Sequence, residues 1–89
     1  MLVEWRPLAR AQLREILEYI SDRNIVAASE LYKNIEAAIS ALPQHPYLYR
    51  FGRVPGTREI VVHPNYLVVY RVTNRIEIVT VLHARQEYP

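Results

Sequence analysis

The stretch YLVVYRVTNRIEIVTVLH, residues 66–83, decides the fold because it contains two strand-like segments joined by a short turn. The segments 66–72 and 76–83 are rich in valine, isoleucine and tyrosine, which strands favour because these side chains pack well on a pleated surface. Thr73 and Asn74 between them are turn-prone residues. We therefore predict an antiparallel hairpin with a two-residue turn.

A two-residue turn sets the register of this hairpin, because loop length fixes which residues lie opposite each other. It pairs Tyr70 with Glu77 and Val68 with Val79. Tyr66 and Tyr70 then share a face with Val68, which favours structural over binding roles for both tyrosines. Both faces are apolar in the middle, so we expect helices to cover one face and a partner or the chain ends to cover the other.

A third strand is predicted upstream of the hairpin. TREIVV, residues 57–62, is followed by the turn-prone HPN, so the three strands form an antiparallel meander. Before it, residues 43–56 contain both glycines of the protein and several prolines, which predicts a connecting loop. After it, the tail ARQEYP, residues 84–89, is polar, and we expect it to contribute little to the core.

Two helices are predicted in the first half of the chain. Apolar residues recur at helical spacing within residues 7–23 and again within residues 25–42. Asn24 is a suitable N-cap for the second helix, and Pro43 stops it. So short a connection makes the two helices an antiparallel hairpin. Residues 2–6 alternate in polarity and predict a short N-terminal strand, which gives an α+β fold.

Length and composition limit the class of protein. The 89 residues are enough for one domain, 1–89, with a single core. The chain has no cysteine, which excludes disulfides and thiolate zinc sites. Apolar runs are far shorter than the roughly 20 residues of a membrane-spanning helix. Glu4 and Arg6 interrupt the start where a signal peptide would be apolar. We expect a cytoplasmic domain with no membrane contact.

No metal or cofactor site is expected. His45, His63 and His83 are far apart and lack the close ligand spacing of a zinc motif. FGRVPGT, residues 51–57, has two glycines but not the context of a phosphate-binding loop.

Charge is unevenly distributed along the chain. Residues 1–49 contain five basic and six acidic side chains, whereas residues 50–89 contain six arginines and three glutamates. Arginine binds phosphate, carboxylate and aromatic partners better than lysine does. The second half therefore carries the candidate contact residues.

Three motifs in this half identify a family. GTRE enters a strand, VVYRV forms its centre, and VLHARQ stands near the end. With the two preceding helices and the initial strand, the whole chain resembles the RelE/ParE superfamily of bacterial toxins from type II toxin–antitoxin modules. The resemblance implies a helical hairpin packed on a curved antiparallel sheet and a tightly bound cognate antitoxin.

The resemblance leaves two targets open, because the RelE branch cleaves mRNA on the ribosome whereas the ParE branch poisons DNA gyrase. Basic residues of the ribonuclease branch correspond here to Ile60 and Leu67. VLH followed by an arginine is more similar to ParE, which we favour. If the protein is instead a metal-independent ribonuclease, the candidate catalytic residues are Arg58, His83, Arg85 and Tyr88.

Binding of the target is assigned to the exposed basic residues of the second half: Arg53, Arg58, His63, Arg71, His83 and Arg85. Arg58, Arg71 and His83 also have a structural interpretation. Arg58 and Arg71 can pair with Glu59, Glu77 or the antitoxin, and a histidine at a strand end, such as His83, commonly bonds the nearby main chain.

Overall fold

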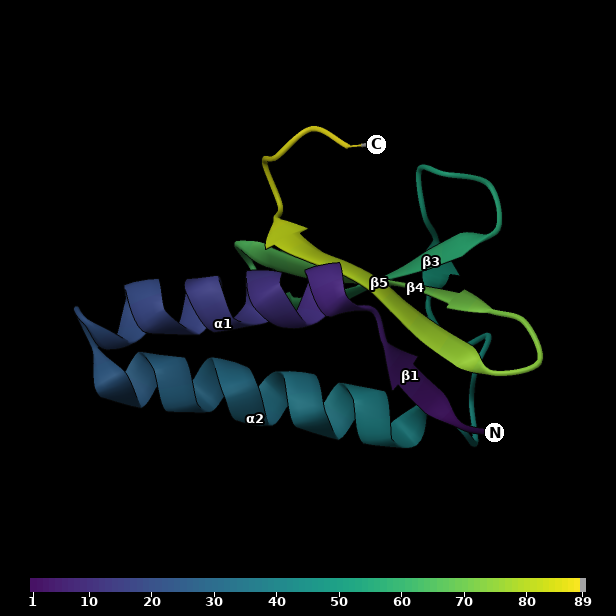
Figure 1. Ribbon diagram of the computed structural model, residues 1–89, viewed down its shortest axis with the longest axis horizontal. Coiled ribbons are helices and arrows are strands. Elements are labelled where there is room, and N and C mark those ends of the chain that lie inside the picture. Colours follow the sequence, from purple (N-terminus) through teal and green to yellow (C-terminus); the bar gives the residue numbers. More distant parts are fainter. Residues whose placement is uncertain (89) are drawn as a thin grey trace.

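The computed structural model describes residues 1–88 and has two layers, a helical hairpin and a five-stranded sheet (Figure 1). This arrangement confirms the predicted α+β fold with its N-terminal strand and helical hairpin. In chain order, the elements are β1 (Val3–Trp5), α1 (Pro7–Ser21), α2 (Ile25–Ala41), β2 (Arg50–Phe51), β3 (Thr57–His63), β4 (Tyr66–Val72) and β5 (Ile76–His83).

The sheet has the strand order β1-β5-β4-β3-β2. The predicted meander is confirmed, since β3, β4 and β5 are antiparallel neighbours. β1, however, pairs with β5 in parallel, so the sheet is mixed rather than wholly antiparallel. Parallel neighbours require a crossover connection, and the two helices form part of the long chain between β1 and β5. Sequence alone also missed β2, a two-residue edge strand within the predicted loop.

The predicted register of the β4–β5 hairpin is wrong. The connection has three residues, with the Thr73 N–H donating to the carbonyl oxygen of Arg75 at 2.8 Å. Tyr70 therefore lies opposite Ile78, and a register shift beside it places Val68 opposite Val81. The extra residue in β5 brings its isoleucines and Val81 to the helix-facing side, because burial of the apolar set determines register more strongly than turn length.

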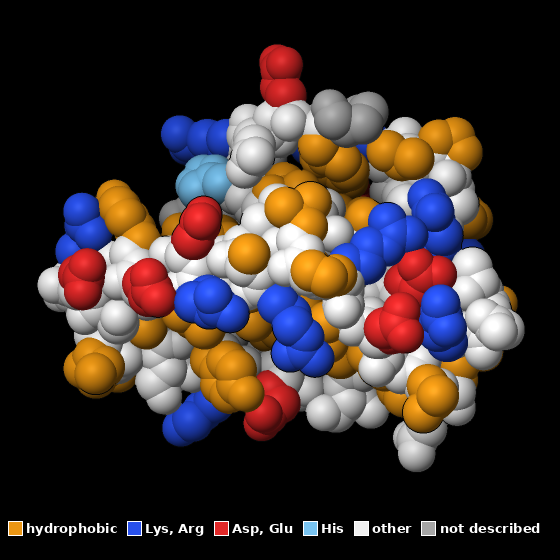
Figure 2. All heavy atoms as spheres, in the orientation of Figure 1, with side chains coloured by type: hydrophobic (Ala, Val, Ile, Leu, Met, Phe, Trp, Pro, Cys, Tyr) orange, Lys and Arg blue, Asp and Glu red, His pale blue; other side chains and the backbone are white. Residues whose placement is uncertain are grey.

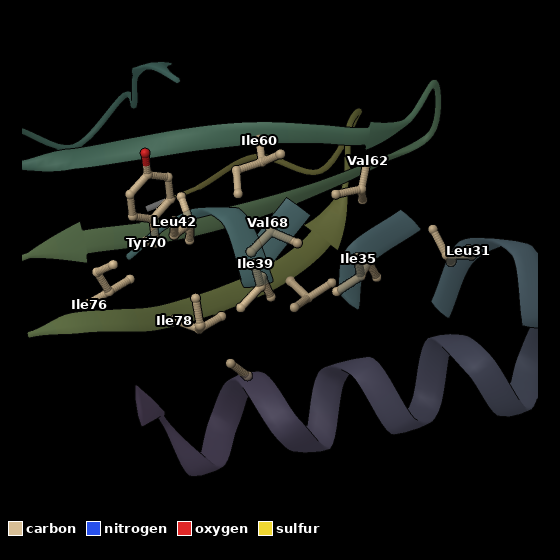
Figure 3. Packing of buried hydrophobic residues seen from close by; sticks show 12 residues of the cluster. Leu31, Ile35, Ile39, Leu42, Ile60, Val62, Val68, Tyr70, Ile76 and Ile78 are labelled. Atoms are coloured by element: carbon tan, nitrogen blue, oxygen red, sulfur yellow. The ribbon is translucent and has the colours of Figure 1, made fainter. Parts of the chain in front are cut away.

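The helices begin and end as the sequence predicts. The Asn24 side chain accepts a hydrogen bond from the Ala27 N–H at 3.1 Å, which confirms it as the N-cap of α2. One face of α2 is buried against the sheet, as Figure 3 shows for Ile35 and Ile39 between the helices and the strands. The buried centre of this core consists of Leu31, Ile35, Ile39, Leu42, Ile60, Val62, Val68, Tyr70, Ile76, Ile78, Val81 and Ala9.

The other face of the sheet has a second, smaller core. Leu67, Val69 and Leu82 are almost fully buried there, and the tail residues Ala84 and Tyr88 pack against them. The prediction that the chain ends or a partner cover this face is confirmed for the C-terminal end. The expectation that the tail adds little core is wrong, because Tyr88 brings an aromatic ring to this face. Pro89, also part of that prediction, lies outside the described residues.

Within residues 1–88, neither helix combines the length and the apolar character that crossing a membrane requires.

Candidate functional site

Arg58, a candidate for both catalysis and binding, holds the connection between α2 and β3. It lies opposite Tyr70 in the sheet. Its Nη1 donates hydrogen bonds to the carbonyl oxygens of Tyr47 at 3.1 Å and Tyr49 at 2.8 Å. Its guanidinium carbon also lies 5.1 Å from the centre of the Tyr47 ring and 4.4 Å from that of Phe51. Arg58 is therefore bound to main chain and aromatic rings rather than to Glu59.

We call residues 43–56 the aromatic lobe, because it carries Tyr47, Tyr49 and Phe51. Tyr70 secures the lobe from beneath: its hydroxyl donates to the Pro46 carbonyl oxygen at 2.8 Å, and its ring meets that of Tyr49 edge-on at 6.4 Å. Burial raises the pKa of the Tyr70 hydroxyl, which keeps the donor proton in place. The prediction that Tyr70 is structural is confirmed.

Two turns close the lobe onto β3. The Gly52 N–H donates to the Thr57 carbonyl oxygen at 2.8 Å, and the Thr57 N–H donates back to the Val54 carbonyl oxygen at 3.1 Å. A Cβ at position 52 would lie only 2.3 Å from the Thr57 hydroxyl oxygen, and Gly56 has a φ of +85°. Both glycines are therefore required by the local geometry.

On the opposite face of the sheet, the buried carboxylate of Glu59 contacts the exposed Arg50 and the partly buried Tyr88. Glu59 is only 5% exposed. Arg50 Nη2 lies 3.0 Å from one carboxylate oxygen, and the Tyr88 hydroxyl donates to the other. The guanidinium carbon of Arg53 lies 4.8 Å from the centre of the Tyr88 ring. Tyr88, a candidate catalytic residue, is thus engaged in a structural contact.

The two candidate histidines gather at the far end of the sheet around Tyr66. The Tyr66 ring lies 5.7 Å from that of His63 and 5.4 Å from that of His83. Each histidine Nδ1 accepts a main-chain N–H: His63 from Asn65 at 3.0 Å and His83 from Arg85 at 3.1 Å. An accepting Nδ1 places the ring proton on Nε2. Both imidazoles therefore stabilise turns, the structural role that the sequence also allowed for His83.

Arg71 lies opposite Glu77 on β5, but Glu77 pairs with Arg6 instead. Arg6 Nη2 donates to the Glu77 carboxylate at 2.8 Å. This hydrogen bond is the main reason why the pKa of Glu77 lies below its usual value, and the nearby charges of Arg75 and Arg71 lower it further. Arg71 thus contributes to a charged network at the start of β5.

The four candidate catalytic residues do not form one site. Arg58 lies opposite Tyr70, and His83 lies opposite Tyr66, four residues away on β4. At 3.3 Å per residue, this spacing separates them by about 13 Å along the strand direction alone, and β4 lies between their two strands. Tyr88 bonds Glu59 on the other face, and the exposed Arg85 contributes its N–H to His83. A general acid and base must both reach the reacting group, which this distribution does not favour.

A groove of about 730 Å³ runs between α1 and α2. Figure 2 shows hydrophobic side chains over the helices with basic and acidic side chains beside them. The apolar lining of the groove includes Leu13, Leu17, Ile25, Tyr32 and Ile39. The charged rim of the groove includes Arg10, Arg14, Glu18 and Glu36. Sequence periodicity identified the apolar stripes of the two helices but not that a groove stays open between them.

Two features of the site escaped sequence reasoning. Glu59 looked like a surface partner for arginines, and its burial depends on Arg50 and Tyr88, which come from opposite sides of it in the chain. Tyr47 and Phe51 lie in the segment predicted to be a connecting loop. Arginines stand close to them in the sequence, at positions 50 and 53, and this pattern could have indicated a contact surface. Within residues 1–88, no group of histidine and acidic side chains is arranged to hold a metal ion.

Comparison with known proteins identifies relatives of this chain. The family described as the ParE toxin of type II toxin–antitoxin system, parDE, matches residues 3–88. "Putative toxin Y4kP" from Sinorhizobium fredii is 36% identical over 88 residues, which is 98% of this chain and 92% of that protein.

Solved structures share the fold. A chain of the chromosomal ParDE toxin–antitoxin system from P. aeruginosa superposes with a TM-score of 0.81 at 22% identity, covering 93% of this chain and 95% of that one. The YoeB/ParE toxin from Agrobacterium tumefaciens gives 0.67 at 15% identity, covering 99% and 100% of the two chains.

Proposed function

The chain belongs to the ParE toxin family of type II toxin–antitoxin systems, and from this premise we propose that it inhibits bacterial growth by poisoning DNA gyrase while a cognate antitoxin holds it inactive. In this mechanism the toxin acts by binding and needs no catalytic residue of its own. Its place of action is the cytoplasm, where gyrase works.

The observation that carries this proposal concerns Ile60 and Leu67, the positions that correspond to basic residues in the ribonuclease branch. Both are 2% exposed. Ile60 lies in the core beneath the helices, and Leu67 lies in the second core beneath Tyr88. An unpaired basic side chain at either position would place a charge in an apolar core, which is strongly unfavourable. The sheet therefore lacks two of the basic side chains of the ribonuclease branch, although Arg58 is present on β3, and this incomplete set supports the gyrase mechanism.

Ribosome-dependent mRNA cleavage remains the second candidate because of one feature. His83 uses Nδ1 for its bond to the Arg85 N–H, which leaves Nε2 to transfer a proton beside the exposed Arg85 side chain. The two mechanisms differ in their products, since one yields gyrase-linked DNA breaks and the other cut transcripts.

Two assays with the purified protein test the proposal. We expect it to convert supercoiled plasmid into gyrase-dependent cleavage complexes and to leave mRNA on programmed ribosomes intact. Antitoxin added in equimolar amount should restore gyrase activity. Cleaved mRNA together with unaffected gyrase would replace the proposal with the second candidate.

The α1–α2 groove is the surface that best fits the antitoxin. It is apolar along its floor, and its rim carries Arg10 and Arg14 as well as Glu18 and Glu36. An amphipathic antitoxin segment can place apolar anchors in such a groove and acidic side chains against the arginines, a common mode of helix recognition.

Neighbouring residues at the start of α2 provide a matched test. Ile25 lines the groove and is 73% exposed, whereas Val26 is 62% exposed and points elsewhere. Ile25→Glu should weaken antitoxin binding at least tenfold in calorimetric titration, and Val26→Glu should bind as the native protein does. Equal binding by both variants would remove the groove from the antitoxin interface.

A further inference from the structure

The aromatic lobe exposes large apolar side chains that the core does not use. Tyr47 is 62% exposed, Leu48 64% and Phe51 77%. In Figure 1 the lobe lies at the end of the molecule opposite the turn that joins α1 and α2. The lobe is therefore a separate surface from the outer end of the α1–α2 groove.

The lobe is held by several hydrogen bonds, although its side chains Tyr47, Leu48 and Phe51 stay exposed. Arg58 binds two of its carbonyl oxygens, the Tyr70 hydroxyl binds a third, and Thr57 closes its end. A surface fixed in this way loses little conformational entropy when a partner binds, which favours affinity. Tyrosine, phenylalanine and arginine are also the residues enriched at the centres of protein interfaces.

The charge of the lobe specifies the partner. Between Glu36 and Glu59 the sequence contains no acidic residue but has Arg50, Arg53 and Arg58. Within residues 1–88, Arg50 is the one of these three that pairs with a carboxylate, that of the buried Glu59. The exposed surface of the lobe is therefore basic and aromatic, complementary to a segment with carboxylates and an apolar anchor.

We propose that the aromatic lobe, through Leu48, Phe51 and Arg53, is the surface by which this toxin grips its target protein, at a segment carrying acidic and apolar side chains. The inference rests on the proposed function for the existence of a target protein, but it assigns that contact to residues that do not line the antitoxin groove. The short edge strand β2 adds main-chain groups to the contact, because no described strand pairs with its outer side.

The double variant Leu48→Ala/Phe51→Ala tests the lobe. Both side chains are exposed, so the variant should keep its circular dichroism spectrum and its antitoxin affinity. We expect the variant to inhibit growth less, so that the inducer dose needed to stop growth rises at least tenfold. The matched control is Leu8→Ala, 61% exposed at the start of α1 near the opposite edge of the sheet, which should stay fully toxic. Undiminished toxicity of the double variant would overturn the inference.

Binding to purified gyrase separates this inference from the proposed function. If native protein binds gyrase and the double variant binds at least tenfold more weakly, the lobe inference and the proposed function are both supported. If both bind equally, the lobe inference fails and the proposed function stands. If native protein does not bind gyrase, the proposed function fails, and the growth assay alone decides whether the lobe contacts another target.

Arg53 tests the chemistry of the partner. Arg53→Glu should weaken gyrase binding at least tenfold, whereas Arg53→Lys should retain most of it. The same variants are titrated against labelled single-stranded DNA, because phosphate is the other acidic partner of arginine. Loss of DNA binding with unchanged gyrase binding would overturn the assignment to an acidic protein segment.

Discussion

The hydroxyl group of Tyr88 donates a hydrogen bond to the buried carboxylate of Glu59, and so ties the C-terminal tail to β3. Arg50 holds the other carboxylate oxygen from β2. Glu59 therefore joins an edge strand to the tail, and the ring of Tyr88 at the same time covers the second core. Tyr88, a candidate catalytic residue, thus also has a structural role.

The first prediction is that Tyr88→Phe destabilises the protein although it keeps the ring. The substitution leaves Glu59 with Arg50 as its only side-chain partner in the described structure. A hydrogen bond to a charged group contributes about 1.5–3 kcal/mol, so we expect a loss of that size in the free energy of unfolding measured with urea. Tyr19→Phe, at a 57% exposed position, is the control and should change nothing. If Tyr88→Phe has the same free energy of unfolding as the native protein, Arg50 alone satisfies the carboxylate.

The second prediction is that truncation after His83 lowers stability. Without the tail, the three residues of the second core, which are at most 3% exposed, face water. Truncation also removes the Tyr88 hydrogen bond to Glu59, so its effect should exceed that of Tyr88→Phe. We expect the midpoint of thermal unfolding to fall by roughly 15 °C or more, corresponding to about 3 kcal/mol or more in a domain of this size. The full-length variant Arg85→Ala/Gln86→Ala removes exposed tail side chains and should melt as the native protein does. A truncated protein with an unchanged midpoint would show that the tail is dispensable as a cover.

The elements that sequence predicts well are those in which apolar residues recur regularly over many residues. Both helices and the three long strands were found within one or two residues, because each buries a regular stripe. β2 has no such stripe. Its two residues are exposed, and they form a strand because Arg50 and Phe51 pair with Glu59 and Arg58, residues that lie seven to nine positions further along the chain.

The register and the site depend on features that have no local sequence signal. The extra residue in β5 becomes apparent only when Ile76, Ile78 and Val81 must all face the helices. Likewise, the predicted role of Arg58 in catalysis or binding stays a prediction. Its hydrogen-bond acceptors are carbonyl oxygens of the aromatic lobe, and main-chain acceptors cannot be read from residue types.

The third prediction concerns Tyr70→Phe, which should loosen the aromatic lobe without disturbing the core. The variant loses only the hydrogen bond to the Pro46 carbonyl oxygen, worth about 0.5–1.5 kcal/mol. Amide hydrogen exchange should quicken in residues 43–56 and stay unchanged in α1. Tyr32→Phe, half exposed on α2, serves as the control. Unaltered exchange in the lobe would assign its rigidity to the hydrogen bonds of Arg58 and Thr57.

The fourth prediction is a pH dependence that comes from Glu77. The hydrogen bond from Arg6 lowers the pKa of Glu77 in the folded state, so folding favours the carboxylate. Its contribution to stability is complete above the usual glutamate pKa of about 4.3 and is lost as the pH falls through the lowered pKa of the folded protein. In urea unfolding, Glu77→Gln should be less stable than native protein at pH 7, and the difference should shrink toward pH 3.

Glu30→Gln, at an exposed position of α2, provides the control for this titration and should follow the native curve. A difference between Glu77→Gln and the native protein that stays constant from pH 7 to pH 3 would attribute the effect to packing instead of the ion pair.

The last prediction uses the symmetry of the two histidines around Tyr66. His83→Gln keeps a side-chain acceptor for the Arg85 N–H but cannot transfer a proton near neutral pH. If the toxin acts by binding gyrase, the variant should inhibit growth within a few-fold of native protein. His63→Gln is the matched control, since His63 accepts the Asn65 N–H in the same way on the other side of the Tyr66 ring. A general acid or base contributes about 100-fold or more to a rate. Loss of toxicity on that scale for His83→Gln, with His63→Gln still active, would therefore identify His83 as a proton donor or acceptor and favour ribosome-dependent cleavage over the gyrase mechanism.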